Sequence, residues 1–332
     1  MNYNNRIYGA SIIKAVNSNY NADFSHQPRT LPNGVVYATD KALKYAIKNY
    51  LKDSFSIEKI FYLKRFRLNT DDFVPYSLME AFCAMFPELA EITDAGTKKE
   101  KVKLKASKKQ VGKALLDCLD IRLFGATFAM KGSKKEDNLA ISIHGPVQIN
   151  HGINIWNENN IYSEQIMSPF RNPGESNKGE EEQIKAATTL GRQSKLQEGH
   201  YLHHFSVNPK NLQDITQLVG DGASSLTNKD IDKLKEALLR GVTLYDSASK
   251  AGSENEALIW VQLKSDSKAI MPNFSQLVEM KEEKENGKVV LDCSALTNKI
   301  ENIHDDIDEI EFYINKDSMV LENAPSDTII DL

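Results

Sequence analysis

The segment from Asp120 to Gly152 constrains the fold more than any other part of the chain. It reads DIRLFGATFAMKGSKKEDNLAISIHGPVQINHG, with two apolar runs around a short basic turn, and it ends in the run Gly145 to Gln148. Residues 121–130 are apolar on both faces apart from one arginine, which predicts a strand covered on both sides. Residues 141–149 alternate instead, which predicts a strand with one core face and one polar face. The expected core face holds Ile141, Ile143, Val147 and Ile149, and the expected polar face holds Ser142, His144 and Gln148.

The composition is that of an ordinary globular protein. The chain has 332 residues, of which 41% are hydrophobic and 26% charged, enough for one large domain with insertions or for two domains. The N-terminus lacks the basic and apolar regions of a secretory signal, and no run of about 18 apolar residues occurs. We therefore expect a cytoplasmic protein with no membrane segment.

Candidate metal, cofactor and nucleophile sites are weak. Cys83, Cys118 and Cys293 are far apart and form no CxxC pair, so we expect buried free thiols. The HxxHH run of His200, His203 and His204 would send neighbouring side chains to opposite faces of a strand, which disfavours a shared metal. No phosphate-binding loop and no GxSxG motif is present. We expect no metal, no cofactor and no catalytic residue.

The charge is unevenly distributed along the chain. Residues 279–332 hold 15 acidic and 5 basic residues, a balance of −10, so the net charge of −5 leaves +5 for residues 1–278. Seven lysines cluster between Lys98 and Lys109, and the turn after residue 130 adds three more. Such a run is most often a solvated face or a mobile loop, although basic blocks around a common groove would attract phosphates.

The first fifty residues predict a strand, a loop and a helix. Ile7 to Ala15 has the pattern of a strand, and the polar segment from Asn17 to Gly34 that of a long loop. Thr39 or Asp40 can cap a following helix that has one apolar side and one basic side. The apolar side is formed by Leu43, Ala46, Ile47, Tyr50 and Leu51, and the basic side by Lys41, Lys44, Lys48 and Lys52.

The rest of the chain predicts further strands and helices around insertions. Residues 53–110 favour a mostly helical insertion that ends in the lysine block, and residues 162–196 favour a long projecting hairpin or loop. The expected regular elements are a helix over 111–119, a strand over 201–207, a helix over 228–239 between Thr227 and Gly241, and strands over 257–264 and 311–314. This order predicts an α+β protein with a ferredoxin-like, RRM-type sheet.

Two features suit a phosphate-bearing ligand. Like charges on one helix face repel one another, and an anionic partner for Lys41, Lys44 and Lys48 would reverse that cost. Gly145-Pro146 would allow a ligand backbone to approach the sheet, with donors on His144 and Gln148 beside it. The alternatives are solvated surface lysines and a Gly-Pro bulge that ends an edge strand.

Taken together, the motifs resemble one family, the backbone subunits of type I-B CRISPR Cascade complexes. The matching features are an Asn-rich loop that ends at Pro28-Arg29, the basic helix Lys41 to Lys52, the strand Asp120 to Ala126, Gly145 to Gln148, Gly191-Arg192 in the projecting segment, and the Ser-rich turn Ser247 to Lys250 before the strand ALIWVQLK. They occur in order over about residues 5 to 265, which makes the resemblance specific although no single motif is.

The resemblance implies a hand-like protein with a discontinuous RRM-type palm, helical fingers and a hairpin thumb. The palm would comprise residues 1–52, 111–161 and 197–278, the fingers 53–110 and the thumb 162–196. Residues 279–332 would form an acidic extension that is either a subunit contact or a solvated end. Copies of the chain would stack in a helical filament along CRISPR RNA, with other Cascade subunits, and would present the spacer for pairing with target DNA.

Site residues follow from the same resemblance. The expected RNA contacts are Arg29, Lys41, Lys44, Lys48, His144, Gly145, Gln148, Arg171 and Arg192. The expected target-strand contacts are Lys98, Lys99, Lys101, Lys103, Lys105, Lys108 and Lys109. The preferred hypothesis is a non-catalytic RNA-binding scaffold in the prokaryotic cytoplasm. Its alternatives are RNA-guided RNA cleavage by Asp23 in the first loop, as in related type III subunits, and a structural protein that binds no nucleic acid.

Overall fold

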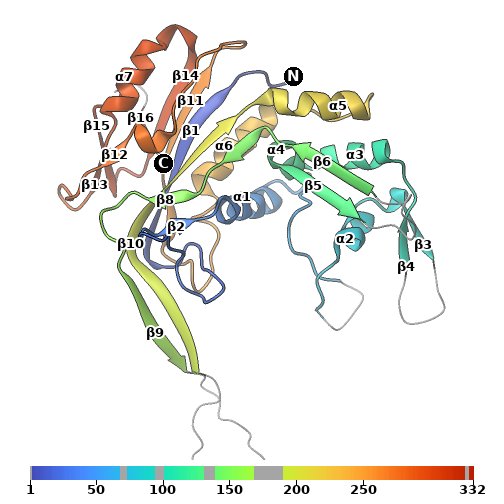
Figure 1. Cartoon of the computed structure of the whole chain (residues 1–332), viewed down its shortest axis with the longest axis horizontal. Helices are drawn as coiled ribbons and strands as arrows, with labels where there is room; N and C mark the ends of the chain where they lie inside the picture. Colours follow the sequence, from blue (N-terminus) through green and yellow to red (C-terminus); the bar gives the residue numbers. More distant parts are fainter. Residues whose placement is uncertain (1, 68–72, 94–100, 131–138, 168–189, 326–328) are drawn as a thin grey trace, which may run out of the picture.

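A large, mainly antiparallel sheet forms the centre of the molecule (Figure 1). The computed structural model describes residues 2–67, 73–93, 101–130, 139–167, 190–325 and 329–332. The strands lie in the order β16-β14-β11-β1-β10-β8-β2, and β7 and β9 also pair with β10. Their bounds are β1 (Ile7–Ser18), β2 (Tyr37–Ala38), β7 (Val147–Ile149), β8 (Gly152–Asn154), β9 (Ile161–Met167), β10 (Leu190–Val207), β11 (Ser253–Leu263), β14 (Ile307–Ile314) and β16 (Ile329–Asp331).

Two long helices cover one face of this sheet. They are α1 (Asp40–Ser54) and α6 (Asn228–Arg240), and their apolar sides share one core with β1, β10 and β11. The five residues predicted for the apolar side of α1 are all buried, so that prediction is confirmed. The predicted start of α6 is confirmed too, because Thr227 and Asp230 cap each other's backbone amides, and Gly241 follows the last turn.

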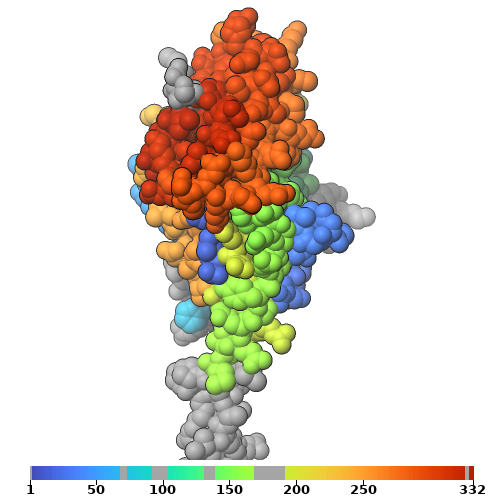
Figure 2. All heavy atoms as spheres, turned by 90° about the vertical axis from the view of Figure 1, so that its left-hand side faces the viewer, coloured from blue at the N-terminus to red at the C-terminus, as the bar shows by residue number. Residues whose placement is uncertain are grey.

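The C-terminal segment covers the opposite face. It contributes β12 (Glu279–Met280), β13 (Val289–Asp292), α7 (Ser294–Asn302) and β15 (Met319–Glu322), which enclose a second core against the sheet. In the space-filling view it forms one continuous mass beside the N-terminal part of the chain (Figure 2). The alternative that residues 279–332 form a solvated end is therefore wrong, because the described part of this segment is packed against the sheet. The strand expected over 311–314 begins at Ile307, and it is followed by β15 and β16 rather than being the last.

The described residues of the insertion after α1 are not mostly helical, so that prediction is wrong for them. It holds α2 (Leu78–Met85), and then an antiparallel pair of strands, β3 (Ala90–Thr93) and β4 (Lys101–Leu104). Lysines alternate with apolar residues along 101–105, which is the period of a strand. The lysine block therefore contains a strand. The next helix, α3 (Lys108–Leu116), starts and ends about three residues earlier than expected.

The buried strand predicted over residues 121–130 is wrong in its first half. Residues 119–124 form the short helix α4 (Leu119–Phe124), and only β5 (Gly125–Met130) is extended. The Asp120 carboxylate accepts hydrogen bonds from the backbone amides of Phe61 and Tyr62, both at 2.8 Å, which holds the start of the helix in place. Gly125 has a φ of +73°, a conformation that favours glycine, and there the helix ends.

The alternation predicted for residues 141–149 is confirmed, but the segment is divided. β6 (Leu139–His144) pairs with β5 in a separate two-stranded sheet, and β7 belongs to the main sheet. The four residues expected in the core are buried, and the three expected on the polar face are exposed. The division falls at Gly145-Pro146.

The remaining elements are short. They are η1 (Pro87–Leu89), η3 (Pro209–Leu212), α5 (Gln213–Val219), η4 (Phe274–Gln276) and η5 (His304–Asp306). The three cysteines are buried and free, as predicted. None of the helices in the described part of the chain is long and apolar enough to cross a membrane.

Candidate nucleic-acid interface

The first loop is joined to the start of α1 and to β10. The Asn21 side-chain oxygen accepts hydrogen bonds from the amide and the hydroxyl of Thr39, at 2.9 and 3.0 Å. Thr39 is the N-cap residue of α1, but its side chain makes no capping hydrogen bond to the helix and donates to Asn21 instead. The Asn19 amide donates to the Ser194 carbonyl of β10 at 3.2 Å. The loop therefore fixes the position of two elements far apart in the sequence.

The Ser-rich turn meets the same loop. Lys250 donates to the Tyr20 carbonyl at 2.6 Å and lies over the rings of Tyr20 and Tyr245, at 5.5 and 5.8 Å from their centres. Burial lowers the pKa of Lys250. In the sequence, this turn is only one of the motifs that carry the family resemblance. The lysine's place beside the first loop arises from contacts between distant segments, which no local pattern reports.

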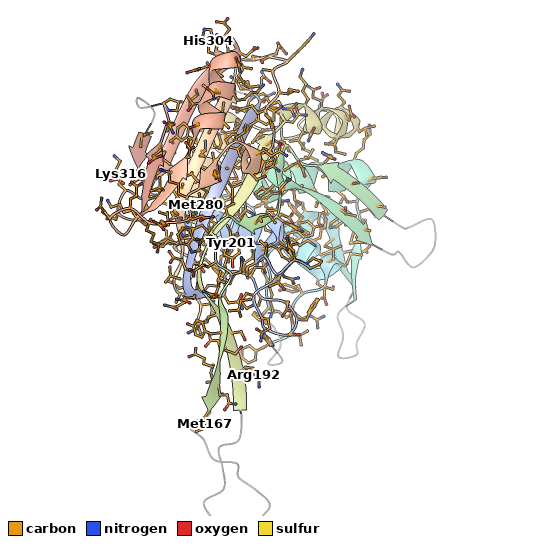
Figure 3. All side chains as sticks on the ribbon, turned by 60° about the vertical axis from the view of Figure 1, so that its left-hand side comes forward. Met167, Arg192, Tyr201, Met280, His304 and Lys316 are labelled. Carbon is orange, nitrogen blue, oxygen red and sulfur yellow. The ribbon has the colours of Figure 1, made fainter. Side chains whose placement is uncertain are left out.

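The hairpin of β9 and β10 extends away from the body of the molecule (Figure 3). Arg192 is exposed, faces Gln165 across the pair, and lies with Met167 toward the end of the described hairpin. Gln193 donates to the Ala248 carbonyl at 3.1 Å, which ties the hairpin to the Ser-rich turn. Arg171, the other predicted hairpin residue, lies outside the described residues.

Three of the four lysines predicted for the basic side of α1 have different environments. Lys41 is exposed and, among the described residues, makes no ion pair. Lys44 pairs with Asp40 at 3.0 Å, and its ammonium group lies 5.6 Å from the centre of the Phe124 ring. Lys48 donates to the Tyr62 carbonyl at 2.8 Å, and burial lowers its pKa against the opposing effect of Asp120. The expectation of one free cationic face is therefore wrong, because the segments holding Tyr62 and Phe124 pack onto it.

Gly145 does not line an open surface, contrary to prediction. A Cβ atom at this position would lie 2.1 Å from the Phe124 carbonyl carbon and 2.2 Å from the Gly125 nitrogen. Two segments of this chain approach each other here, and no ligand backbone is needed to explain the glycine. His144 and Gln148 remain exposed beside it, with the Gln148 amide donating to the Gly145 carbonyl at 2.8 Å.

The predicted RNA contacts that remain accessible fall into two groups. Arg29 lies in the first loop, Lys41 at the start of α1 and Arg192 in the hairpin, and we call these three the loop-side group. His144, in the separate sheet of β5 and β6, and Gln148, in β7, form the sheet-side group. The first loop begins where Ser18 pairs with Leu196, ten residues along β10 from the partner of Gln148, which is about 33 Å at about 3.3 Å per residue. The end of the loop lies nearer, because the Arg29 carbonyl accepts a hydrogen bond from the Tyr37 amide and Tyr37 pairs with Ile153, opposite Leu202.

Arg29 lies in the second half of the first loop. Its Nε donates to the Ala22 carbonyl at 3.1 Å, and the side chain is partly exposed. Asp23, the candidate for RNA cleavage, accepts hydrogen bonds from the amides of Ser25 and Gln27 on one oxygen, at 2.8 and 2.9 Å. These bonds shape the loop, which is a structural role for Asp23.

The three histidines of β10 lie in separate environments. His200 hydrogen-bonds Glu256 at 2.5 Å. Burial lowers the pKa of His200, but its contacts with Glu198 and Glu256 outweigh burial, so the pKa is raised. His203 packs against Tyr20 on the opposite face, and burial lowers its pKa to about 4. Within the described ranges, no group of three or more His, Cys, Asp or Glu residues is placed to hold a metal ion.

The lysine block lies in the insertion, on the flank of the molecule that bears β3 and β4 (Figure 1). Lys105, Lys108 and Lys109 are exposed. Lys101 and Lys103 belong to β4, and Lys98 and Lys99 lie outside the described residues. The described lysines of the block and the described part of the hairpin occupy different parts of the molecule, so these residues do not form one cationic patch.

The fold and these surfaces define an α+β protein whose exposed cations lie on helices, loops and a projecting hairpin around a central sheet. The family model described as CRISPR-associated protein Cas7 matches residues 5–305. The chain belongs to this family.

Two solved structures match this chain, and the first of them has a similar fold. One is described as "CRISPR RNA-guided surveillance complex, pre-nicking": its matching chain has a TM-score of 0.53 and 11% identity, and the match covers 98% of this chain and 96% of that one. A second, described as "CRISPR RNA-guided surveillance complex", has a TM-score of 0.49 and 11% identity, over 97% and 96% of the two chains. No curated protein sequence matches significantly.

Proposed function

We propose that this chain is the backbone subunit of a type I-B CRISPR surveillance complex. It is a non-catalytic scaffold that binds the sugar-phosphate backbone of CRISPR RNA independently of sequence. Copies of the chain assemble along the RNA with other subunits of the complex, in the prokaryotic cytoplasm, and leave the spacer bases free to pair with target DNA. The family membership and the similar fold support this proposal.

In this proposal, β11, β1, β10 and the strands β7 and β8 form an RRM-type palm, with α1 and α6 on one face. The order of these strands and helices along the chain and in the sheet supports it, because strand, helix, two strands, helix and strand is the ferredoxin-like sequence of elements. The insertion over 53–110 provides the fingers, and the hairpin of β9 and β10 provides the thumb.

The observation that carries the proposal is the convergence of three elements, α1, β10 and the Ser-rich turn, on the first loop. Asn21 holds the start of α1, Asn19 holds β10, and Lys250 reaches the loop from the Ser-rich turn. Since Arg29, Lys41 and Arg192 lie in the loop, at the start of α1 and on β10, one anionic strand passing the loop can meet all three. Backbone phosphates suit such a set, because separate cations at several levels attract a chain of charges whatever its bases.

The lysines of the insertion have a separate role in the proposal. Lys105, Lys108 and Lys109 are exposed on a different part of the molecule from the loop-side group. A second strand, paired with the guide, would carry phosphates of its own. We assign Lys98, Lys99, Lys101, Lys103, Lys105, Lys108 and Lys109 to that target strand.

The experiment is to purify the chain and measure its RNA content and RNA affinity. The proposal predicts copurifying RNA of uniform, repeat-derived length, and similar affinities for two RNAs of equal length and unrelated sequence. It also predicts that affinity falls steeply as salt is raised, since phosphate contacts release counterions. A protein free of RNA that shows no salt-sensitive binding to either oligonucleotide contradicts the proposal.

A further inference from the structure

Residues 282–284 of the C-terminal segment contact both strands of the projecting hairpin at its root. On the β9 side, Asn157 lies four residues before the strand begins and donates its side-chain amide to the Glu282 carbonyl at 2.8 Å. On the β10 side, Lys284 donates to both carboxylate oxygens of Glu198, at 2.6 and 2.7 Å, two residues beyond the last pair with β9. The space-filling view accordingly shows the C-terminal segment lying against the connection between β8 and β9 (Figure 2).

The 282–284 stretch is mounted on a well-defined part of the molecule. It belongs to the connection between β12 and β13, two paired strands whose buried side chains lie in the second core. The connection turns at Asn286-Gly287, where both φ angles are positive, at +51° and +80°, as a two-residue hairpin turn requires. The Lys284 ammonium group also lies 5.6 Å from the centre of the Trp156 ring, which belongs to the same core. The stretch therefore holds the hairpin from a fixed base.

A chain of polar contacts continues from Lys284 into the protein. Glu198 contacts the His200 ring at 3.4 Å, and its bonds with His200 and Lys284 lower the pKa of Glu198 to about 2 against the effect of burial. His200 in turn bonds Glu256, whose other carboxylate oxygen accepts a hydrogen bond from the Ser318 hydroxyl at 3.0 Å. Lys284 and Ser318 both belong to the C-terminal segment. This segment therefore holds β10 from two points.

Beyond its root, the hairpin has little packing of its own. Six of the seven residues of β9 are exposed. A second set of contacts ties the hairpin to the first loop and the Ser-rich turn: the Tyr162 hydroxyl donates to the Asn17 side-chain oxygen at 3.2 Å, and Asn19 and Gln193 make the bonds described above. The direction of the hairpin thus depends on single side-chain contacts with two separate segments, the first loop and the C-terminal segment.

We propose that the 282–284 stretch sets the angle of the hairpin relative to the first loop and so places Arg192 for contact with RNA. Lys284 acts through Glu198 and is a positioning residue. This inference rests on the proposed function for its effect on RNA, while the angle of the hairpin is a property of the free protein. It gives the C-terminal segment a role that the contacts of the loop-side group alone do not include.

The first test measures the hairpin directly. Spin labels on Gln165→Cys in β9 and Lys229→Cys at the start of α6 report the distance between hairpin and body in the full-length protein freed of RNA, since both sites are exposed and the native cysteines are buried. Lys284→Met should broaden and shift the distance distribution, and Lys284→Arg should restore it, because arginine can also bond a carboxylate.

The second test measures RNA affinity in a double-mutant cycle. Lys284→Met should lower the affinity about threefold, because only the molecules whose hairpin stays in place bind fully, and Lys284→Arg should bind like the wild type. In an Arg192→Ala background, Lys284→Met should cause no further loss, since the contact that it positions is already absent. The matched control is Lys281→Met, an exposed lysine three residues away that pairs with Glu322 within the C-terminal segment and should change neither readout.

The outcomes separate the two proposals. Unchanged distances and affinity in Lys284→Met overturn the positioning role and leave the proposed function standing. Losses that add up in the double variant show that Lys284 contacts RNA itself, which also overturns it, as does a Lys281→Met variant that behaves like Lys284→Met. Failure of the wild type to bind RNA overturns the proposed function, while the distances still decide whether the stretch sets the hairpin angle.

Discussion

Two parts of the molecule use charged side chains in opposite ways. In the segment from Asp120 to Gly125, Arg122 is buried and binds Asp230 through two nitrogens, at 3.0 and 3.3 Å, and also contacts Glu58 at 3.5 Å. In the loop-side group, Arg192 and Lys41 are exposed. The charges in the segment with the strongest sequence signature hold the fold together, and those around the first loop are available to a ligand. A strong motif therefore identifies the fold without marking the site.

The largest effect is expected from Arg122→Ala. It leaves the Asp230 carboxylate buried without its partner and frees the carbonyls of Leu116 and Asp117, so the free energy of unfolding should fall by about 3–5 kcal/mol. Chemical denaturation measures this. Arg192→Ala is the matched control, an exposed arginine whose loss should change stability by less than about 0.5 kcal/mol. Equal effects of the two changes would remove the distinction between the regions.

Gly145→Ala should destabilise the protein next most. The added methyl group would overlap the Phe124 carbonyl and the Gly125 backbone, which are not flexible side-chain ends, so a loss of about 1–3 kcal/mol is expected. The control is Gly191→Ala, where the nearest atoms would lie 3.7 Å from the new Cβ. If Gly145→Ala were as stable as the wild type but bound RNA poorly, the glycine would serve the ligand after all.

A pH effect is expected from His203. Burial lowers its pKa to about 4, so the unfolded chain takes up a proton near the ordinary histidine pKa of 6.5 and the folded chain does not. Stability conferred by the neutral ring is thus present above pH 6.5 and is lost between pH 6.5 and 4, by about 1–2 kcal/mol from pH 7 to pH 5. His203→Gln should flatten this part of the stability curve, as measured by denaturation at each pH. A curve of unchanged slope would show that another group titrates.

The smallest effects separate two lysines of one helix. Lys48→Ala removes the hydrogen bond to Tyr62 and should cost about 1 kcal/mol of stability, with the salt dependence of RNA binding unchanged. Lys41→Ala should leave stability unchanged and reduce the slope of log affinity against log salt by about 0.7. Denaturation and RNA titrations at several salt concentrations measure both. If Lys48→Ala changed the salt slope and Lys41→Ala did not, RNA binding could not be assigned to the side of α1 that holds Lys41.

The predictions from the sequence were correct for elements whose local spacing of apolar and polar residues matches their burial in the fold. The apolar side of α1, the caps of α6 and the alternation of residues 141–149 were all correct, because each depends on local spacing. The errors arise where a distant segment decides. Asp120 makes a helix start by binding amides at residues 61 and 62, and Lys48 loses its exposure to the segment that holds Tyr62.

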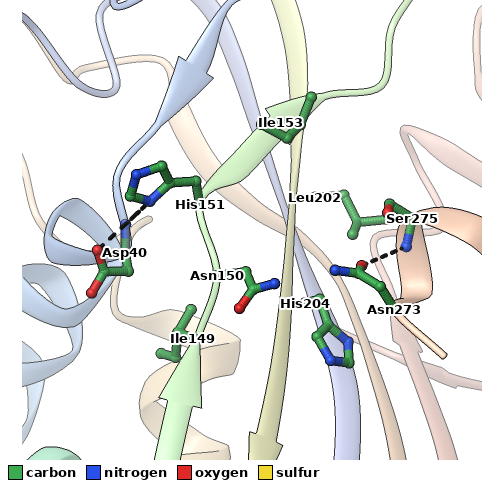
Figure 4. A pocket seen from close by; sticks show the side chains of 9 residues that line it. All are labelled: Asp40, Ile149, Asn150, His151, Ile153, Leu202, His204, Asn273 and Ser275. Atoms are coloured by element: carbon green, nitrogen blue, oxygen red, sulfur yellow. Dashed lines mark hydrogen bonds and ion pairs between the residues drawn. The ribbon is translucent and has the colours of Figure 1, made fainter. Parts of the chain in front are cut away.

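The candidate site was predictable only in part for the same reason. Arg29, Lys41 and Arg192 could be named from the sequence, but Lys250 could not, because its neighbour Tyr20 is 230 residues away. A pocket between the start of α1, the strands β7, β8 and β10 and the η4 turn (Figure 4) also escaped prediction, since its lining comes from segments far apart in the sequence.

The most direct measurement is the RNA affinity of a triple variant, Arg29→Ala, Lys41→Ala and Arg192→Ala, at several salt concentrations. The control variant replaces three exposed lysines outside the loop-side group with alanine and so removes the same charge. These lysines are Lys229, Lys268 and Lys316. The loop-side group predicts at least a tenfold loss of affinity and a salt slope lower by about 2 in the triple variant, with normal stability and little change in the control. Equal losses in both variants, or none in either, would contradict the assignment of RNA backbone binding to the loop-side group.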